Sequence, residues 1–154
     1  MPAWQEARAR QIIDLHRTVE GPALVTLHAL QREFGFVSDE AVVLVADALN
    51  LTRAEVHGIV TFYHDFRREP AGRHVLKLCR AEACQALGGE GLAAHGRSRL
   101  GVSWGETTAD GRVTLEPVFC LGLCASGPAA MIDGRPVGRL DAARLDRLLD
   151  EVAS

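Results

Sequence analysis

Apolar side chains recur every third or fourth residue through the first 70 residues of the chain, which is the spacing of one face of an α-helix. A first helix is predicted between Trp4 and Leu15. A second is predicted between Pro22, which suits the first turn of a helix, and Gly35, which suits a helix end. Each stripe is apolar on one side only, so we expect these helices to pack against one another.

Two polar start signals predict two further helices. Ser38 is an expected N-cap, and the acidic residues that follow it lie where the helix dipole favours negative charge. Asn50 interrupts this helix. Thr52 and Glu55 have the spacing of a capping box, which predicts a fourth helix that continues past Val60.

Residues 1–70 therefore predict an N-terminal helical bundle. The segment Thr61–Phe66 ends this part with three aromatic residues. They fit core packing, and they also fit a contact surface for a partner, because aromatic residues are enriched in interfaces. The polar segment Arg67–Gly72 contains proline and glycine, so we place a boundary there and predict a second domain over residues 71–154.

The second half of the chain alternates between strand and helix patterns. His74–Leu78 predicts a strand, and Glu82–His95 predicts one helix although three glycines weaken it. The later elements are a short strand at Val102–Thr107, a strand at Val113–Val118, a hairpin formed by Ala129–Ile132 and Pro136–Gly138, and a last helix capped by Asp141. This order predicts an α/β (α+β) fold with one small sheet.

Composition narrows the function classes. The chain has 154 residues, of which 47% are apolar and 24% charged, so it can form its own core without disulfide bonds. Its net charge of −3 argues against non-specific binding of nucleic acid. The sequence contains no P-loop, GxGxxG or HExxH motif, so we expect no nucleotide site and no catalytic residues in this chain.

The start of the chain is polar, and no apolar stretch is long enough to span a bilayer. We therefore expect a cytoplasmic protein that does not insert directly into membranes. In a reducing compartment, paired cysteines favour metal binding or redox chemistry over structural disulfides.

All four cysteines lie in one C-x4-C and one C-x3-C pair, formed by Cys79 with Cys84 and, 35 intervening residues later, Cys120 with Cys124. Four thiolates select zinc or the iron of an iron–sulfur cluster. Both spacings are wider than the common zinc knuckle, whereas two pairs on two loops match the two irons of a [2Fe–2S] cluster. The spacing favours an iron–sulfur site and leaves zinc binding and thiol redox chemistry as alternatives.

The surroundings of the cysteines refine this hypothesis. No histidine lies inside either pair, which argues against a Rieske centre, and a thioredoxin-type C-x-x-C motif is absent. Gly122 and Gly127 would allow backbone N–H groups to approach the sulfurs. Arg80 and Glu82 are expected to be solvated rather than to tune the site. The six histidines are expected to have ordinary core or surface roles.

Several motifs together resemble the 24-kDa-type [2Fe–2S] subunit of respiratory NADH:quinone oxidoreductase. They are the cysteine frame, Gly105–Gly111, Val118–Pro128 and the aromatic segment. Within that family, Cys79–Gln85 looks most like the gamma subunit of soluble NAD-dependent formate dehydrogenases that contain molybdenum or tungsten. Related NAD-reducing hydrogenases share the module. Ser126–Ala130 departs from the usual family pattern, which bears on the subgroup but on no ligand.

The resemblance implies a helical N-terminal segment followed by a thioredoxin-like domain, in which Cys79, Cys84, Cys120 and Cys124 bind one [2Fe–2S] cluster. It implies a partner subunit that binds FMN and NAD(H), with the molybdenum or tungsten cofactor also on other subunits. The net reaction of a formate dehydrogenase is formate plus NAD+ to carbon dioxide plus NADH.

Four alternatives to the formate dehydrogenase subunit stay open. They are the equivalent subunit of NADH:quinone oxidoreductase, that of a NAD-reducing hydrogenase, a free-standing ferredoxin, and a zinc-stabilised interaction module.

Overall fold

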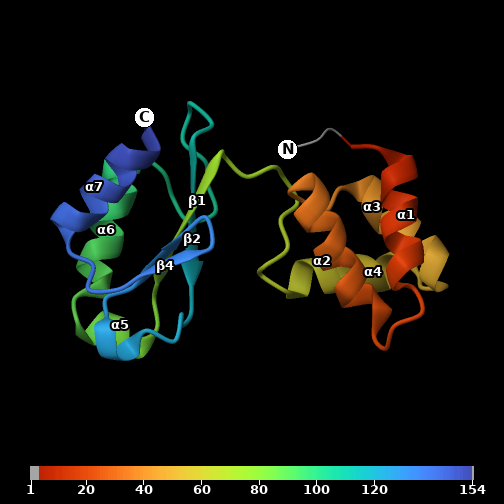
Figure 1. Cartoon of the computed structure of the whole chain (residues 1–154), viewed down its shortest axis with the longest axis horizontal. Coiled ribbons are helices and arrows are strands. Elements are labelled where there is room, and N and C mark those ends of the chain that lie inside the picture. Colours follow the sequence, from red (N-terminus) through yellow and green to blue (C-terminus); the bar gives the residue numbers. More distant parts are fainter. Residues whose placement is uncertain (1–3, 154) are drawn as a thin grey trace. The chain divides into compact units, whose positions relative to one another are not determined.

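The computed structural model describes residues 4–153. The chain divides after Pro70 into two compact units, and Figure 1 traces both from the N-terminus to the C-terminus. The first unit is entirely helical. Its elements are α1 (Glu6–His16), α2 (Pro22–Phe34), α3 (Asp39–Leu49) and α4 (Arg53–Phe62).

The predicted helix ends of the first unit are confirmed. Pro22 occupies the first turn of α2, and Gly35 ends that helix in the left-handed conformation with φ 87°. The Ser38 hydroxyl accepts a hydrogen bond from the Ala41 N–H at 3.2 Å, which caps α3. Asn50 ends α3 with φ 54°, a conformation that asparagine adopts more readily than most residues.

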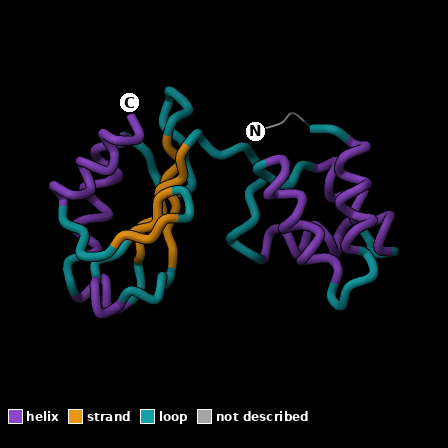
Figure 2. Tube along the Cα trace, viewed as in Figure 1, coloured by secondary structure: helices purple, strands orange, loops and turns teal. Residues whose placement is uncertain are grey.

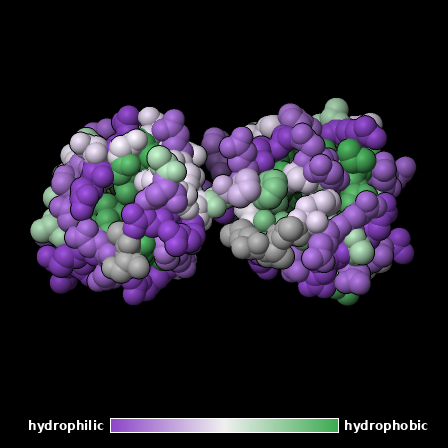
Figure 3. All heavy atoms as spheres, turned by 90° about the horizontal axis from the view of Figure 1, so that it is seen from above, coloured by the Kyte–Doolittle hydropathy of each residue, from purple (hydrophilic) through white to green (hydrophobic). Residues whose placement is uncertain are grey.

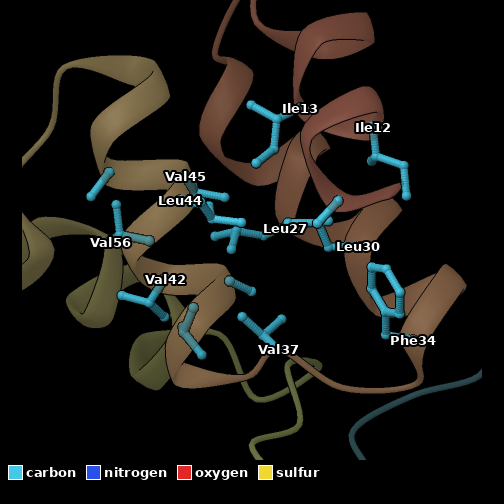
Figure 4. Close-up of a cluster of buried hydrophobic side chains, with 14 of the residues drawn as sticks. Ile12, Ile13, Leu27, Leu30, Phe34, Val37, Val42, Leu44, Val45 and Val56 are labelled. Atoms are coloured by element: carbon cyan, nitrogen blue, oxygen red, sulfur yellow. The ribbon is translucent and has the colours of Figure 1, made fainter. Parts of the chain in front are cut away.

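The first unit is held together by one apolar core that all four helices share. Figure 4 shows its side chains pointing toward one another from α1 to α4. The labelled members are Ile12, Ile13, Leu27, Leu30, Phe34, Val37, Val42, Leu44, Val45 and Val56. Helix α1 buries Ile12 and Ile13, whereas Leu15, the last apolar residue of the predicted helix, is 72% exposed.

The aromatic segment is divided between core and surface. Phe66 is buried and lies with its ring centroid 4.7 Å from that of His28. Phe62 is exposed and contacts Tyr63 edge to face, with 5.1 Å between the centroids. Core packing therefore explains Phe66 but not Phe62.

Replacing Thr52 with alanine should destabilise the first unit by about 1 kcal/mol, because it removes the cap of α4. The Thr52 hydroxyl accepts the Glu55 N–H at 3.2 Å, and a Glu55 carboxylate oxygen accepts the Thr52 N–H at 2.8 Å. Chemical denaturation monitored by circular dichroism measures the change. Thr61→Ala is the matched control, since that hydroxyl bonds only to carbonyls of its own helix. Equal losses in both variants would contradict the capping role.

The same cap makes this stabilisation depend on pH. Hydrogen bonds from the Thr52 backbone and hydroxyl lower the pKa of Glu55 below its ordinary value of 4.5. A carboxyl whose pKa is lowered in the folded state stabilises the fold fully at pH above its unfolded-state pKa. That stabilisation is lost as the pH falls through its folded-state pKa. The stability difference between wild type and Thr52→Ala should therefore shrink below about pH 4.5.

The second unit is built on a four-stranded sheet with the order β2-β1-β3-β4, drawn as the orange segments of Figure 2. Strand β1 pairs in parallel with β2 and antiparallel with β3. The strands are β1 (His74–Cys79), β2 (Val113–Val118), β3 (Ala130–Ile132) and β4 (Arg135–Val137). The helices are α5 (Glu82–Ala86), α6 (Gly89–Leu100), the single 3-10 turn η1 (Cys124–Ser126) and α7 (Ala142–Ala153).

Helices α6 and α7 pack on one face of the sheet (Figure 1). The core between these layers includes Leu76 and Leu115 from the central strands and Leu145 from α7, and each is fully buried. The predicted cap of α7 is confirmed, because an Asp141 carboxylate oxygen accepts the Arg144 N–H at 2.7 Å. The layers agree with the predicted α/β fold.

Two predictions for the second unit were wrong. The expected helix over Glu82–His95 is two helices, because Gly88 adopts φ 91°, which breaks the helix and redirects the chain. Val102–Thr107 forms a loop instead of a strand, and only Thr107 makes an isolated bridge, to Thr114. Its alternating apolar residues pack beside the core without forming a ladder.

No helix within residues 4–153 is both long and apolar enough to cross a lipid bilayer. On the face shown in Figure 3, hydrophilic residues cover most of the surface of each unit, and apolar residues are visible in smaller areas.

Candidate metal centre

The parallel pairing of β1 and β2 brings the two cysteine pairs together. Their register runs to the last residue of each strand, where Cys79 lies opposite Val118. Because the carboxyl ends of parallel strands meet at one edge of a sheet, the loop after Cys79 and the loop after Val118 start side by side. The first loop carries Cys84, and the second carries Cys120 and Cys124.

The sulfur of Cys79 joins the two loops. Backbone N–H groups of Cys120 and Leu121 in the second loop, and of Ala81 in its own loop, act on it and lower its pKa. The thiol of Cys84 interacts electrostatically with both Cys79 and Cys124. The structure therefore gathers all four predicted ligands, which are all free thiols, at one edge of the sheet.

The environment changes the acidity of three thiols. Burial acts to raise the pKa of Cys79, but hydrogen bonds from backbone N–H groups and from Cys84 outweigh it, so that this pKa is lowered. Burial, aided by the neighbouring Cys79, raises the pKa of Cys84. The hydrogen bond with Cys120 raises the pKa of Cys124. Like charges at close range resist ionising together, so a positively charged metal is needed to hold all four as thiolates.

The two pairs differ in their exposure to solvent. Cys79 and Cys84 are buried against Ala129, whereas Cys120 and Cys124 are exposed. Beside the exposed pair, Phe119 keeps 70% of its surface accessible. A group held by the four sulfurs would therefore be covered by protein on one side and open on the other.

The backbone of the second loop has unusual conformations close to the cysteine sulfurs. Cys120 adopts φ 96°, which is unfavourable for any residue with a side chain. Gly122, with φ 74°, donates its N–H to the Cys120 sulfur at 3.3 Å. A Cβ atom at Gly127 would lie 3.4 Å from the Cys84 sulfur and 3.0 Å from a Leu87 methyl group. The Gly122 N–H therefore reaches a sulfur as predicted, whereas the Gly127 N–H donates to the Cys124 carbonyl oxygen at 3.4 Å.

Arg80 does not fit its predicted role. It was expected to be solvated, but its guanidinium donates to a Glu90 carboxylate oxygen at 2.7 Å and lies 5.3 Å from the ring centroid of Trp104. Glu82 is exposed, as expected. Sequence reasoning missed Arg80 because Glu90 and Trp104 approach it only after α6 and the loop before β2 have folded.

The four donors are all sulfurs, and they form two close pairs. The Cys120 and Cys124 sulfurs lie 4.0 Å apart as one pair, and Cys79 and Cys84 form the other. Four thiols, of which two are buried and two exposed, with a backbone N–H donating to one of the sulfurs, match what a [2Fe–2S] cluster requires.

Comparison with models of protein families identifies the family of the chain. The model of the thioredoxin-like [2Fe-2S] ferredoxin family matches residues 9–153. The chain belongs to the thioredoxin-like [2Fe-2S] ferredoxin family. This membership agrees with the sheet and helix layers of the second unit and confirms the predicted thioredoxin-like fold class.

Curated relatives of this ferredoxin confirm the resemblance to the 24-kDa-type subunits. It is 40% identical to a subunit of the NADH-quinone oxidoreductase of Rhizobium meliloti over 145 residues, covering 94% of this chain and 84% of the relative. It is 39% identical to the corresponding NADH-quinone oxidoreductase protein of Pseudomonas aeruginosa over 117 residues, covering 74% and 70% respectively.

A solved NAD+-reducing [NiFe]-hydrogenase has a similar chain, with 31% identity and a TM-score of 0.74 over 89% of the present chain. The ferredoxin spans only 23% of that hydrogenase chain.

Proposed function

We propose that Cys79, Cys84, Cys120 and Cys124 bind one [2Fe–2S] cluster and that the chain is an electron-transfer subunit of a multisubunit NAD-dependent oxidoreductase. The observation that carries the proposal is the parallel pairing of β1 and β2, whose register ends with Cys79 opposite Val118. This pairing brings the two cysteine pairs, which are distant in sequence, to one edge of the sheet. We assign this role to a thioredoxin-like domain over residues 71–154, with residues 1–70 as a helical N-terminal segment.

The chain's own residues divide the work at this site. Cys79 and Cys84 lie in the buried half, where Ala129 and its neighbours exclude water. The N–H groups of Ala81, Leu121 and others donate to sulfur and stabilise its negative charge. A bound [2Fe–2S] cluster supplies one-electron transfer. The exposed side at Cys120 and Cys124 is then the side over which electrons enter and leave.

The partner that we propose is a subunit carrying FMN and NAD(H). Both kinds of relative support it, because their names describe enzymes that use NADH or NAD+. In the hydrogenase, the matching region forms part of a longer chain, which supports a module built for close attachment to other redox domains. We propose no catalytic residue in the present chain, since its site consists of ligands and N–H donors.

The parent enzyme that we favour is a NAD-dependent formate dehydrogenase whose molybdenum or tungsten cofactor lies on another subunit. The segment between the first two cysteines, Arg80–Ala83, supports it through its resemblance to the gamma subunits of those enzymes. The equivalent subunit of NADH:quinone oxidoreductase and that of a NAD-reducing hydrogenase are the alternatives.

Anaerobic purification of the tagged full chain from its own cells tests both levels of the proposal. We expect about two irons and two acid-labile sulfides per chain, because four thiolates hold one two-iron cluster. We also expect an EPR signal after one-electron reduction, and a co-purifying complex that reduces NAD+ with formate. Metal analysis, EPR and activity assays with formate, hydrogen and quinone are run on the same preparation.

The outcomes separate the cluster from the parent enzyme. One zinc per chain with no iron, sulfide or EPR signal would exclude the cluster and favour the zinc-stabilised module. A loaded cluster with hydrogen-driven NAD+ reduction or NADH:quinone activity would exclude only formate dehydrogenase. A loaded chain that carries no partner would favour a free-standing ferredoxin.

A further inference from the structure

Arg80 directly follows Cys79, and its side chain is held by two segments that are remote in sequence. Its Nη2 donates to Glu90 in the first turn of α6 at 2.7 Å, and its Cζ lies 5.3 Å from the Trp104 ring centroid in the loop before β2. Only 28% of the side chain is exposed, compared with 64% for Glu90. This arginine therefore has a defined position instead of a mobile, solvated one.

The position of Arg80 leaves one of its N–H groups without a hydrogen bond. Its Nε is buried and has no hydrogen-bond partner among residues 4–153. A buried donor without a partner is unfavourable, and natural proteins retain such groups where the position serves another purpose. A guanidinium stays charged at every physiological pH, so the fixed quantity at this place is a positive charge.

We infer that Arg80 raises the reduction potential of the site and that Glu90 counteracts it. The inference rests on the proposed [2Fe–2S] ligation by the four cysteines. One-electron reduction adds one negative charge at the site, and a nearby positive charge stabilises the reduced state. Because adjacent Cα atoms are about 3.8 Å apart, the Arg80 guanidinium is within about 10 Å of Cys79. Trp104 is a positioning residue that holds this charge in place.

The test is a redox titration of the cluster-loaded full chain, with dithionite as the electron donor through soluble mediators and EPR as the readout. Arg80→Gln should make reduction less favourable by about three- to tenfold in its equilibrium constant, since an effective dielectric of about 20 applies near a protein surface. Arg80→Lys should restore most of this loss because it keeps the charge. Glu90→Gln should shift the potential in the opposite direction.

Arg99→Gln is the matched control. Arg99 also lies on α6 and pairs with Asp150 at 3.0 Å, but it is nine residues beyond Glu90, which is about 13 Å farther along the helix. We expect no shift of the potential in this variant. The same redox change in Arg99→Gln as in Arg80→Gln would overturn the inference.

Cluster content is measured first, because it separates this inference from the proposed function. Absence of iron and sulfide from the wild-type chain contradicts the ligation itself. Wild-type cluster content with an unshifted potential in Arg80→Gln refutes the role of Arg80 alone. Shifts of the same sign in Arg80→Gln and Glu90→Gln refute it too, because a general loosening of the loop would act in one direction.

Discussion

A chain with serine in place of Cys120 is expected to lose its cluster and keep its fold. A hydroxyl is a poor ligand for iron compared with a thiolate, so the site would keep only three of its four sulfur ligands. Cys120 itself is exposed and lies outside the apolar core of the second unit. The stability of the cluster-free protein should therefore change by no more than about 0.5 kcal/mol.

Iron and sulfide analysis, visible absorption and EPR measure the first effect, and denaturation of the metal-free chains measures the second. Ser126→Ala is the matched control, because it removes a hydroxyl from the same loop without touching a sulfur. It should retain a full cluster. Unchanged iron content and an unchanged spectrum in Cys120→Ser would contradict the ligand assignment.

Gly89→Ala should damage both the stability and the site. A Cβ atom at Gly89 would lie 2.6 Å from the carbonyl oxygen of Cys84 and 2.9 Å from its carbonyl carbon. Both atoms belong to the backbone, so the start of α6 or the loop of Cys84 has to move. We expect a loss of about 1–3 kcal/mol, as for other overpacked sites, together with weaker cluster retention because Cys84 is displaced. Thermal unfolding and iron loss to a chelator measure the two effects.

Gly91→Ala distinguishes this clash from a general effect of alanine in α6. Gly91 lies two residues farther along the same helix, and nothing lies within 4 Å of its would-be Cβ atom. Alanine there should stabilise the helix by about 0.5–1 kcal/mol and leave the cluster in place. Equal behaviour of the two variants would show that the approach of Gly89 to Cys84 is unimportant.

Much of the fold could be predicted because its rules are local. Ser38 and Gly35 act through atoms within one turn of their helices, so their neighbours in sequence are sufficient to recognise them. The pairing of cysteines was predictable for the same reason. The role of Gly88 was harder to predict. A glycine lowers helix stability only slightly, so the sequence does not show whether it ends the helix or only weakens it.

The environment of the site depends on distant contacts and could not be predicted. The N–H groups that act on the Cys79 sulfur belong to Cys120 and Leu121 in the second loop, where Cys120 adopts a positive φ. Arg80 was misjudged because Glu90 and Trp104 meet it only in the folded chain. Composition and periodicity describe which residues are present, but they do not show which residues distant in sequence come into contact.

The parallel pairing of β1 and β2 has a consequence for biosynthesis. Cys79 and Cys84 are synthesised before Cys120. The two cysteine pairs come together only when β2, which follows α5 and α6 in the chain, has paired with β1. Contacts between segments so far apart in sequence form late and slowly. Iron delivered to the nascent chain before Cys120 and Cys124 are made would have only Cys79 and Cys84 as ligands. In the proposed site, all four ligands come together only once β1 and β2 have paired, and the side of Cys120 and Cys124 is the side open to an incoming metal.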